Sequence, residues 1–215
     1  MKPTKIKTVH FAVHRVKNMV TKTALRNRYK RNLRKAGIKR QDSILVATLP
    51  NLQSKASLDL LVDIEKEFQV KISHIHIGRN IPQEINQLAQ KLPGIETIAI
   101  DAEPATYTQL KLKILEKASP HQLVVLPLTA EEIATYFLDE LIRGNIEGLK
   151  LEARHRTAYP LATTTINELQ AVYKQDTLPP ATLYMSKLLE WLAGTVNPQA
   201  LAKFYIDTYA SRSIA

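Results

Sequence analysis

Short apolar runs alternate with helix-type spacing through the middle of the chain, and this alternation constrains the fold more than any other feature. The apolar runs lie at residues 43–47, 70–76, 96–100 and 122–126. The helical patterns lie at residues 54–68, 83–92, 104–118 and 129–142. Such alternation predicts parallel strands, right-handed crossovers and helices on both faces of one sheet. We therefore predict an α/β fold with a Rossmann-like parallel sheet, whose ligand-binding edge lies at the carboxyl ends of the strands.

The two ends of the chain differ from this middle part. Residues 10–37 have helical spacing, and Gly37 is typical of a helix stop. After a short apolar element at 159–161, further helices are expected at about 164–174, 182–194 and 198–211. We divide the chain into a basic N-terminal helical segment (1–41), an α/β domain (42–160) and a helical C-terminal region (161–215).

Positive charge is concentrated in the first segment. Residues 1–41 contain fourteen lysines and arginines and no acidic residue, whereas the other 174 residues have a net charge of −4. Such an excess is the electrostatic footprint of phosphate binding, although a charged face that only aids solubility is an alternative. The candidates for contact with nucleic-acid phosphates are Arg15, Lys17, Lys22, Arg26, Arg28, Lys30, Arg31, Arg34, Lys35, Lys39 and Arg40. Tyr29 lies among them, and its leucine neighbours four residues away on either side favour a core position over stacking on a base.

The composition excludes several classes of site. The chain has no cysteine, which excludes disulfides, zinc ribbons, iron–sulfur clusters and thiol catalysis. His74 and His76 alternate on a strand-like run, so we interpret them as sheet residues rather than metal ligands. No apolar run approaches the ~20 residues of a membrane span, and we expect a soluble, cytoplasmic protein.

The stretch SILVATLPNLQSKASLDLL, residues 43–61, has the order of strand, loop and helix that α/β proteins use to bind phosphate. Ser57 opens a helical apolar face. Phosphate-binding loops usually contain glycine, because glycine lets the backbone come close to an anion. This loop contains none.

The order of the segments resembles the PP-loop ATP pyrophosphatases that thiolate tRNA, the 2-thiocytidine and 2-thiouridine synthetases. Their Ser-Gly-Gly-Lys-Asp-Ser loop corresponds to LQSKAS, in which Lys55 and Ser57 match, while Gln53 and Ser54 replace the glycines and Ala56 the aspartate. The resemblance spans residues 10–205 and implies a Rossmann-like fold of the HUP type.

Two further landmarks carry the resemblance. The Gly-His-x-x-Asp-Asp motif of the family corresponds to PLTAEE, where Glu131 and Glu132 stand for the aspartates, and Thr135 matches a threonine of the next helix. Pro160 and Leu161 match a Pro-Leu pair that follows a short strand. The two cysteine positions of the family would fall near residues 104–107 and 179–182, and neither has a cysteine.

These departures imply a pseudoenzyme with no catalytic residues. In the eukaryotic cytoplasmic thiolation complex of this family, an inactive paralogue accompanies the active subunit. The resemblance therefore implies a non-catalytic tRNA-binding subunit whose partners are tRNA and an active, cysteine-bearing PP-loop paralogue. We expect no cofactor, with weak binding of ATP or phosphate left open at the helix N-terminus near Ser57. The vestigial nucleotide pocket would consist of Gln53, Ser54, Lys55, Ser57, Glu131, Glu132 and Thr135.

Two alternatives remain open from the sequence. One is an ATP-dependent adenylating enzyme with a remodelled loop, in which Lys55 contacts the phosphates and Glu131 and Glu132 hold the metal. The acidic pair is otherwise explained by the dipole of the helix at 129–142. The other is an interaction module whose basic helix docks on an acidic protein or on membrane lipid. Homodimer formation is also left open.

Overall fold

The computed structural model describes residues 20–92, 94–174, 176–179 and 186–210. Their centre is a sheet of five parallel strands in the order β3-β2-β1-β4-β5. The strands are β1 (Ser43–Thr48), β2 (Lys71–Ile77), β3 (Glu96–Ile100), β4 (Leu123–Val125) and β5 (Arg156–Ala158). The four predicted strands and the parallel α/β fold are therefore confirmed.

The fifth strand, β5, precedes the apolar element that was expected at residues 159–161. It is three residues long and contains Arg156 and Thr157, so it has no apolar run by which the sequence could reveal it. It joins the sheet by pairing with β4, and it forms one edge.

The predicted helices are present, and those expected at 83–92, 104–118 and 164–174 are shorter than expected, while residues 10–19 and 182–185 of two others lie outside the described residues. They are α1 (Lys22–Lys35), α2 (Leu52–Phe68), α3 (Gln83–Ala89), α4 (Tyr107–Leu115), α5 (Ala130–Ile142), α7 (Ile166–Val172), α8 (Ser186–Thr195) and α9 (Pro198–Tyr205). A short helix α6 (Ile146–Leu149) and a 3-10 turn η1 (Leu151–Arg154) lead into β5, and α9 continues as a π-helical turn η2 (Ile206–Ala210). Helix α1 ends where predicted, because Gly37 takes φ +76° just after the C-cap.

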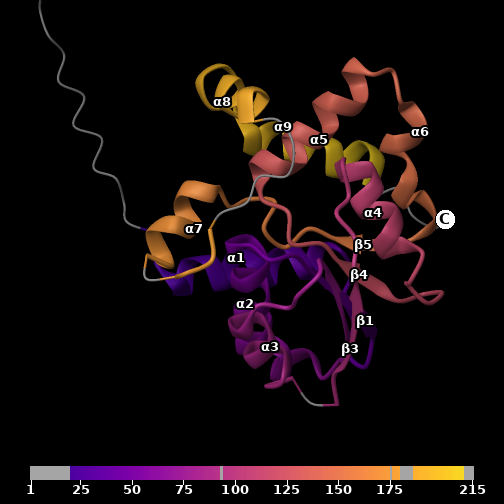
Figure 1. Ribbon diagram of the computed structural model, residues 1–215, viewed down its shortest axis with the longest axis vertical. Coiled ribbons are helices and arrows are strands. Elements are labelled where there is room, and N and C mark those ends of the chain that lie inside the picture. Colours follow the sequence, from indigo (N-terminus) through magenta and orange to yellow (C-terminus); the bar gives the residue numbers. More distant parts are fainter. Residues whose placement is uncertain (1–19, 93, 175, 180–185, 211–215) are drawn as a thin grey trace, which may run out of the picture.

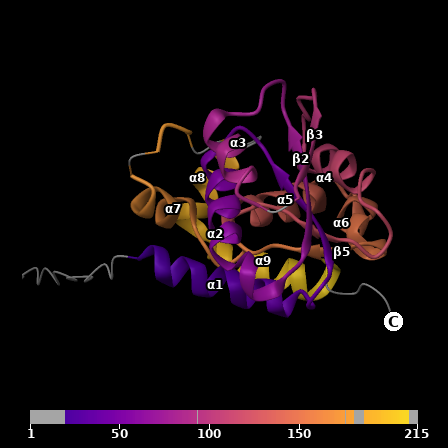
Figure 2. The same cartoon turned by 90° about the horizontal axis from the view of Figure 1, so that it is seen from below.

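The sheet separates two apolar cores, because successive strand side chains point to opposite faces. Ile44 and Val46 of β1 face a core shared with α1, α2, α3 and α7. Leu45 and Ala47 face a second core shared with α4, α5 and α9. Figures 1 and 2 show these two helical layers on either side of the strands. The N-terminal helix α1 thus packs into the α/β core through Leu25, Tyr29 and Leu33.

Tyr29 is fully buried, as its leucine neighbours predicted, and its hydroxyl lies 3.0 Å from Ser57 Oγ. Among the described residues, no helix is both long and apolar enough to cross a membrane.

Candidate nucleic-acid interface

The stretch predicted as a phosphate loop is largely helical. Strand β1 ends at Thr48 and α2 begins at Leu52, so the connection is shorter than the sequence indicated. The prediction that Gln53 belongs to a loop before the helix was wrong. Asn51 is the helix cap, because its side chain accepts from the Ser54 N–H at 2.9 Å.

Two of the backbone donors at this helix start are used by the chain itself. The N–H of Leu52 donates to the carbonyl of Pro179 (3.0 Å), and the N–H of Ser54 is held by Asn51. The Ser54 hydroxyl accepts from the Leu49 N–H at 2.8 Å. Donors occupied in this way are not free to bind phosphate, which is the role that such a helix start plays in nucleotide-binding proteins.

The predicted phosphate lysine is also engaged. Lys55 forms an ion pair with Asp176, and its Nζ lies 5.5 Å from the centre of the Tyr173 ring. Both contacts come from the segment after α7, which closes over the start of α2.

The acidic pair caps two helices. Glu132 completes a capping box at the start of α5, where it accepts from the Thr129 N–H at 2.9 Å, and it also accepts from the Gln53 side chain. Burial raises the pKa of Glu132 to about 8. Glu131, whose pKa burial also raises, accepts from the Ile166 N–H at the start of α7 (3.1 Å).

The remaining pocket candidates have structural contacts as well. Thr135 donates to the Glu131 carbonyl at 2.8 Å, and Ser57 is buried against Tyr29. Among the described residues, no three His, Cys, Asp or Glu side chains come together as a metal site would require. The structure therefore brings Gln53 and Glu132 together, whereas Lys55 is paired elsewhere.

The cations on one face of α1 are paired with acidic residues of α2. Lys22 contacts Asp59 (2.7 Å) and Asp63 (3.0 Å), while Arg26 and Lys30 both contact Glu67. The cations follow each other at intervals of four residues, and so do the acids, so two helices that run side by side can pair them in register. These predicted phosphate ligands are therefore engaged within the chain.

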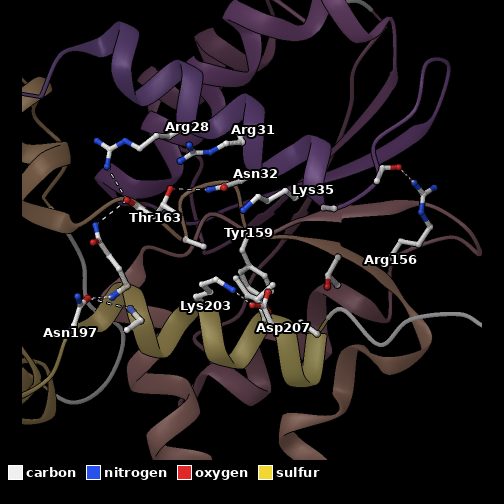
Figure 3. Close-up of a pocket in the computed structure, with 18 of the residues that line it drawn as sticks. Arg28, Arg31, Asn32, Lys35, Arg156, Tyr159, Thr163, Asn197, Lys203 and Asp207 are labelled. Carbon is white, nitrogen blue, oxygen red and sulfur yellow. Dashed lines mark hydrogen bonds and ion pairs between the residues drawn. The ribbon is translucent and has the colours of Figure 1, made fainter.

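A second face of α1 lines a cavity of about 1090 Å³ that lies between α1, the β5 edge and α9 (Figure 3). Six cationic side chains line it, together with the single acid Asp207 among the described lining residues. The cations are Arg28, Arg31, Lys35, Lys39, Arg156 and Lys203.

Only half of these cations are paired. Arg28 bonds Glu168 (3.0 Å), Arg156 bonds Asp42 (2.9 Å), and Lys203 bonds Asp207. Within the part of the chain that the structure describes, Arg31 and Lys35 form no ion pair, while Lys39 lies near Asp42, whose pKa its charge helps to lower. Figure 3 shows Arg31 and Lys35 pointing from α1 into the space above Tyr159 and α9.

The other predicted basic residues lie outside this cavity. Arg34 is exposed, and Arg40 donates to the Gln69 side chain at 3.1 Å. Arg15 and Lys17 lie outside the described residues. Arg156 and Lys203 were missed by the sequence analysis, because both lie outside the basic first segment and only the fold brings them to it.

Comparisons with known proteins identify the fold. No protein-family model matches the chain, and no curated protein does. Among solved structures, one match is "U34-tRNA thiolase NcsA from Methanococcus maripaludis with its 4Fe-4S cluster". The TM-score is 0.59 at 13% identity, over 86% of this chain and 79% of the thiolase. This chain has the fold of a tRNA thiolase.

His74 and His76 are buried sheet residues, as predicted. Both rings bond the Thr48 hydroxyl, His74 through Nε2 (2.8 Å) and His76 through Nδ1 (2.9 Å). His76 Nε2 donates to the Asn80 carbonyl at 3.1 Å, and His74 Nδ1 lies 3.1 Å from the Thr97 hydroxyl. Burial lowers the pKa of His74 to about 4 and also lowers that of His76, which favours neutral, hydrogen-bonding rings.

A buried ion pair on the other side of the sheet was not predicted. Lys111 of α4 and Glu152 of η1 are both fully buried, with Nζ and Oε1 2.5 Å apart. The ammonium lies 3.5 Å from the centre of the Tyr136 ring and 4.8 Å from that of Tyr205. Tyr159, which lines the cavity, also donates to Glu152. Lysine in an amphipathic helix normally predicts a solvent-facing position, so no sequence signal identified this cluster.

Proposed function

We propose that this chain is a non-catalytic tRNA-binding protein of a tRNA-thiolation system. The fold that it shares with the U34-tRNA thiolase NcsA supports tRNA modification as the setting. The basic first segment supports RNA as the ligand, because converging lysines and arginines release counterions from the phosphate backbone when they bind it.

One observation carries the non-catalytic part of the proposal. The groups that would hold a nucleotide are bound to other parts of this chain: the N–H groups of Leu52 and Ser54, the ammonium of Lys55 and the carboxylate of Glu132. ATP would have to displace the Pro179 carbonyl and Asp176 before its phosphates could reach α2. Weak binding of ATP or phosphate is therefore the most that we propose for this site.

The 4Fe-4S cluster of the NcsA structure does not fit this chain. Such clusters are held by cysteine thiolates, and the sequence has no cysteine. Sulfur transfer would accordingly be the task of a partner, and we propose an active, cysteine-bearing PP-loop thiolase that works with this chain in the cytoplasm.

Binding of tRNA and of MgATP to the purified chain tests the proposal. We expect tRNA to bind with an affinity that falls steeply with salt, with a log–log slope of about −2 or steeper if Arg31, Lys35 and Lys39 each contact a phosphate. We expect millimolar MgATP to leave the melting temperature unchanged, both for the wild type and for Lys55→Ala.

Three results would contradict this reasoning. A rise in melting temperature with MgATP that Lys55→Ala abolishes would identify a nucleotide-binding enzyme instead. Binding to anionic vesicles without binding to tRNA would identify a membrane interaction module. Recovery of neither a cysteine-bearing PP-loop protein nor tRNA with a tagged, folded chain from its host would refute the partner role.

A further inference from the structure

We propose that the cavity between α1 and α9 binds a single-stranded segment of RNA and holds its phosphates between cationic side chains on opposing walls. This inference rests on the proposed tRNA-binding function and specifies which part of the RNA the chain holds. Its evidence is the charge, the shape and the hydrogen bonding of the cavity.

Part of the positive charge of the cavity is not neutralised within the described fold. Arg31 and Lys35 lie one helical turn apart on α1 and point into the cavity, and Lys39 follows just beyond the helix. Arg31 and Lys35 form no ion pair among the described residues, whereas the α2-facing cations of the same helix, Lys22, Arg26 and Lys30, all form one. Like charges that converge in a concave space repel each other, and an anionic ligand removes that repulsion.

The walls carry charge on both sides. Arg31 and Lys35 lie on α1, Lys203 lies opposite on α9, and Arg156 lies at the β5 edge (Figure 3). Lys203 and Arg156 are paired with acids of the chain, and a phosphate could share their remaining N–H donors. A ligand with phosphates spaced along its length is therefore favoured over one with a single anionic group.

The shape favours a single strand. A volume of about 1090 Å³ is slightly above the ~300–1,000 Å³ that small-molecule pockets have, so it exceeds the needs of one phosphate. The cavity lies between two helices of one chain, and a double helix is too wide to enter such a space. RNA duplexes are instead read from outside, across the wide minor groove.

The polar groups of the cavity indicate little base selectivity. Asn32 donates to the Pro160 carbonyl (2.9 Å) and the Thr163 hydroxyl (3.1 Å), and Gln199 donates to the Thr163 carbonyl (3.1 Å). These bonds use both N–H groups of Asn32 and one of the two of Gln199, so few amide donors remain for base edges. Phosphate contacts of the remaining cations fix the position of the strand but carry no sequence information.

The test compares RNA ligands and charge variants of the full chain. The ligands are tRNA, a single-stranded RNA of about ten nucleotides and a blunt RNA duplex of the same length. About ten nucleotides lies within the range of site sizes of single-strand-binding domains. The cavity variant is Arg31→Gln/Lys35→Gln. The matched control is Arg34→Gln/Arg40→Gln, which removes the same charge from exposed positions outside the cavity. Circular dichroism melting confirms that both variants fold.

We expect the single strand to bind more tightly than the duplex. The cavity variant should bind the single strand and tRNA at least tenfold more weakly at about 0.1 M salt, with a log–log salt slope shallower by about 1.4, which is two contacts at about 0.7 each. The control should change affinity less than threefold.

Each other outcome overturns the inference in a distinguishable way. Equal weakening by the two variants, or equal affinity for the duplex, would leave tRNA binding in place but on the outer surface of the chain. Competition by free ATP at equimolar concentration would identify a site for a small polyphosphate. No binding of the wild-type chain to any RNA would refute the proposed function together with the inference.

Discussion

Replacing Lys111 by methionine tests whether the buried ion pair holds the second helical layer together. The Lys111 side chain is fully buried, and its ammonium lies 2.5 Å from Glu152 Oε1. Because no part of this side chain is exposed, contact with solvent cannot replace the ion pair. Methionine fills a similar volume among the tyrosine rings, so the change removes the charge with little change in packing. Glu152 then remains buried without its cation.

The expected loss follows from these contacts. Breaking a buried pair by removing one partner costs about 3–5 kcal/mol. The lower end applies here, because the hydroxyls of Thr157 (3.1 Å) and Tyr159 still donate to Glu152. We therefore expect Lys111→Met to lower the free energy of unfolding by about 3 kcal/mol, or about 1 M in the urea midpoint for a slope near 3 kcal/mol per M.

A double-mutant cycle provides the control. Glu152→Gln keeps an acceptor for only one of the two hydroxyls, which bond different carboxylate oxygens, and leaves the ammonium without its anion, so we expect a loss at least as large. The double variant Lys111→Met/Glu152→Gln should lose less than the two single changes together, with a coupling of about 1.5–3 kcal/mol. Single losses below about 1 kcal/mol, or strict additivity, would show that the pair contributes nothing beyond packing.

Two further predictions concern buried polar groups. Because burial lowers the folded pKa of His74 to about 4 from an unfolded value near 6.5, the wild type should lose stability as the pH falls below about 6.5. The His74→Gln variant lacks this titration, so the stability advantage of the wild type over it should shrink by about 2 kcal/mol between pH 7 and pH 5, measured by urea unfolding; an advantage that stays constant would refute the shift. Gly148→Ala places a Cβ against the carboxylate of Glu140, which is itself bonded to Thr108 and Asn145, and should cost about 1–3 kcal/mol in the same assay. Gly194→Ala, where a Cβ has open space, is its control and should be neutral or slightly stabilising.

The apolar pattern determined most of the architecture before any tertiary information. Four strands are local apolar runs flanked by turn residues, and the helices between them carry one apolar face each, so both can be read from neighbouring residues. The start of α2 could also have been predicted from neighbouring residues. Asn51 stands three residues before Ser54, as a helix cap residue should. The resemblance to a phosphate loop outweighed that signal.

The candidate site is different, because the sequence determined that it is positively charged, whereas only the fold determined where it lies. Fourteen basic residues without an acid predicted a binding segment for phosphate. Glu67 is distant in sequence and lies beside only one face of α1. It pairs with Arg26 on that face, whereas Arg31 on the cavity face remains available to a ligand. The burial of Lys111 likewise depends on Glu152 and on three tyrosines from other elements. Local spacing decides which residues form a helix or a strand, whereas the partner of a charge is decided by chain segments that meet only when the two layers pack on the sheet.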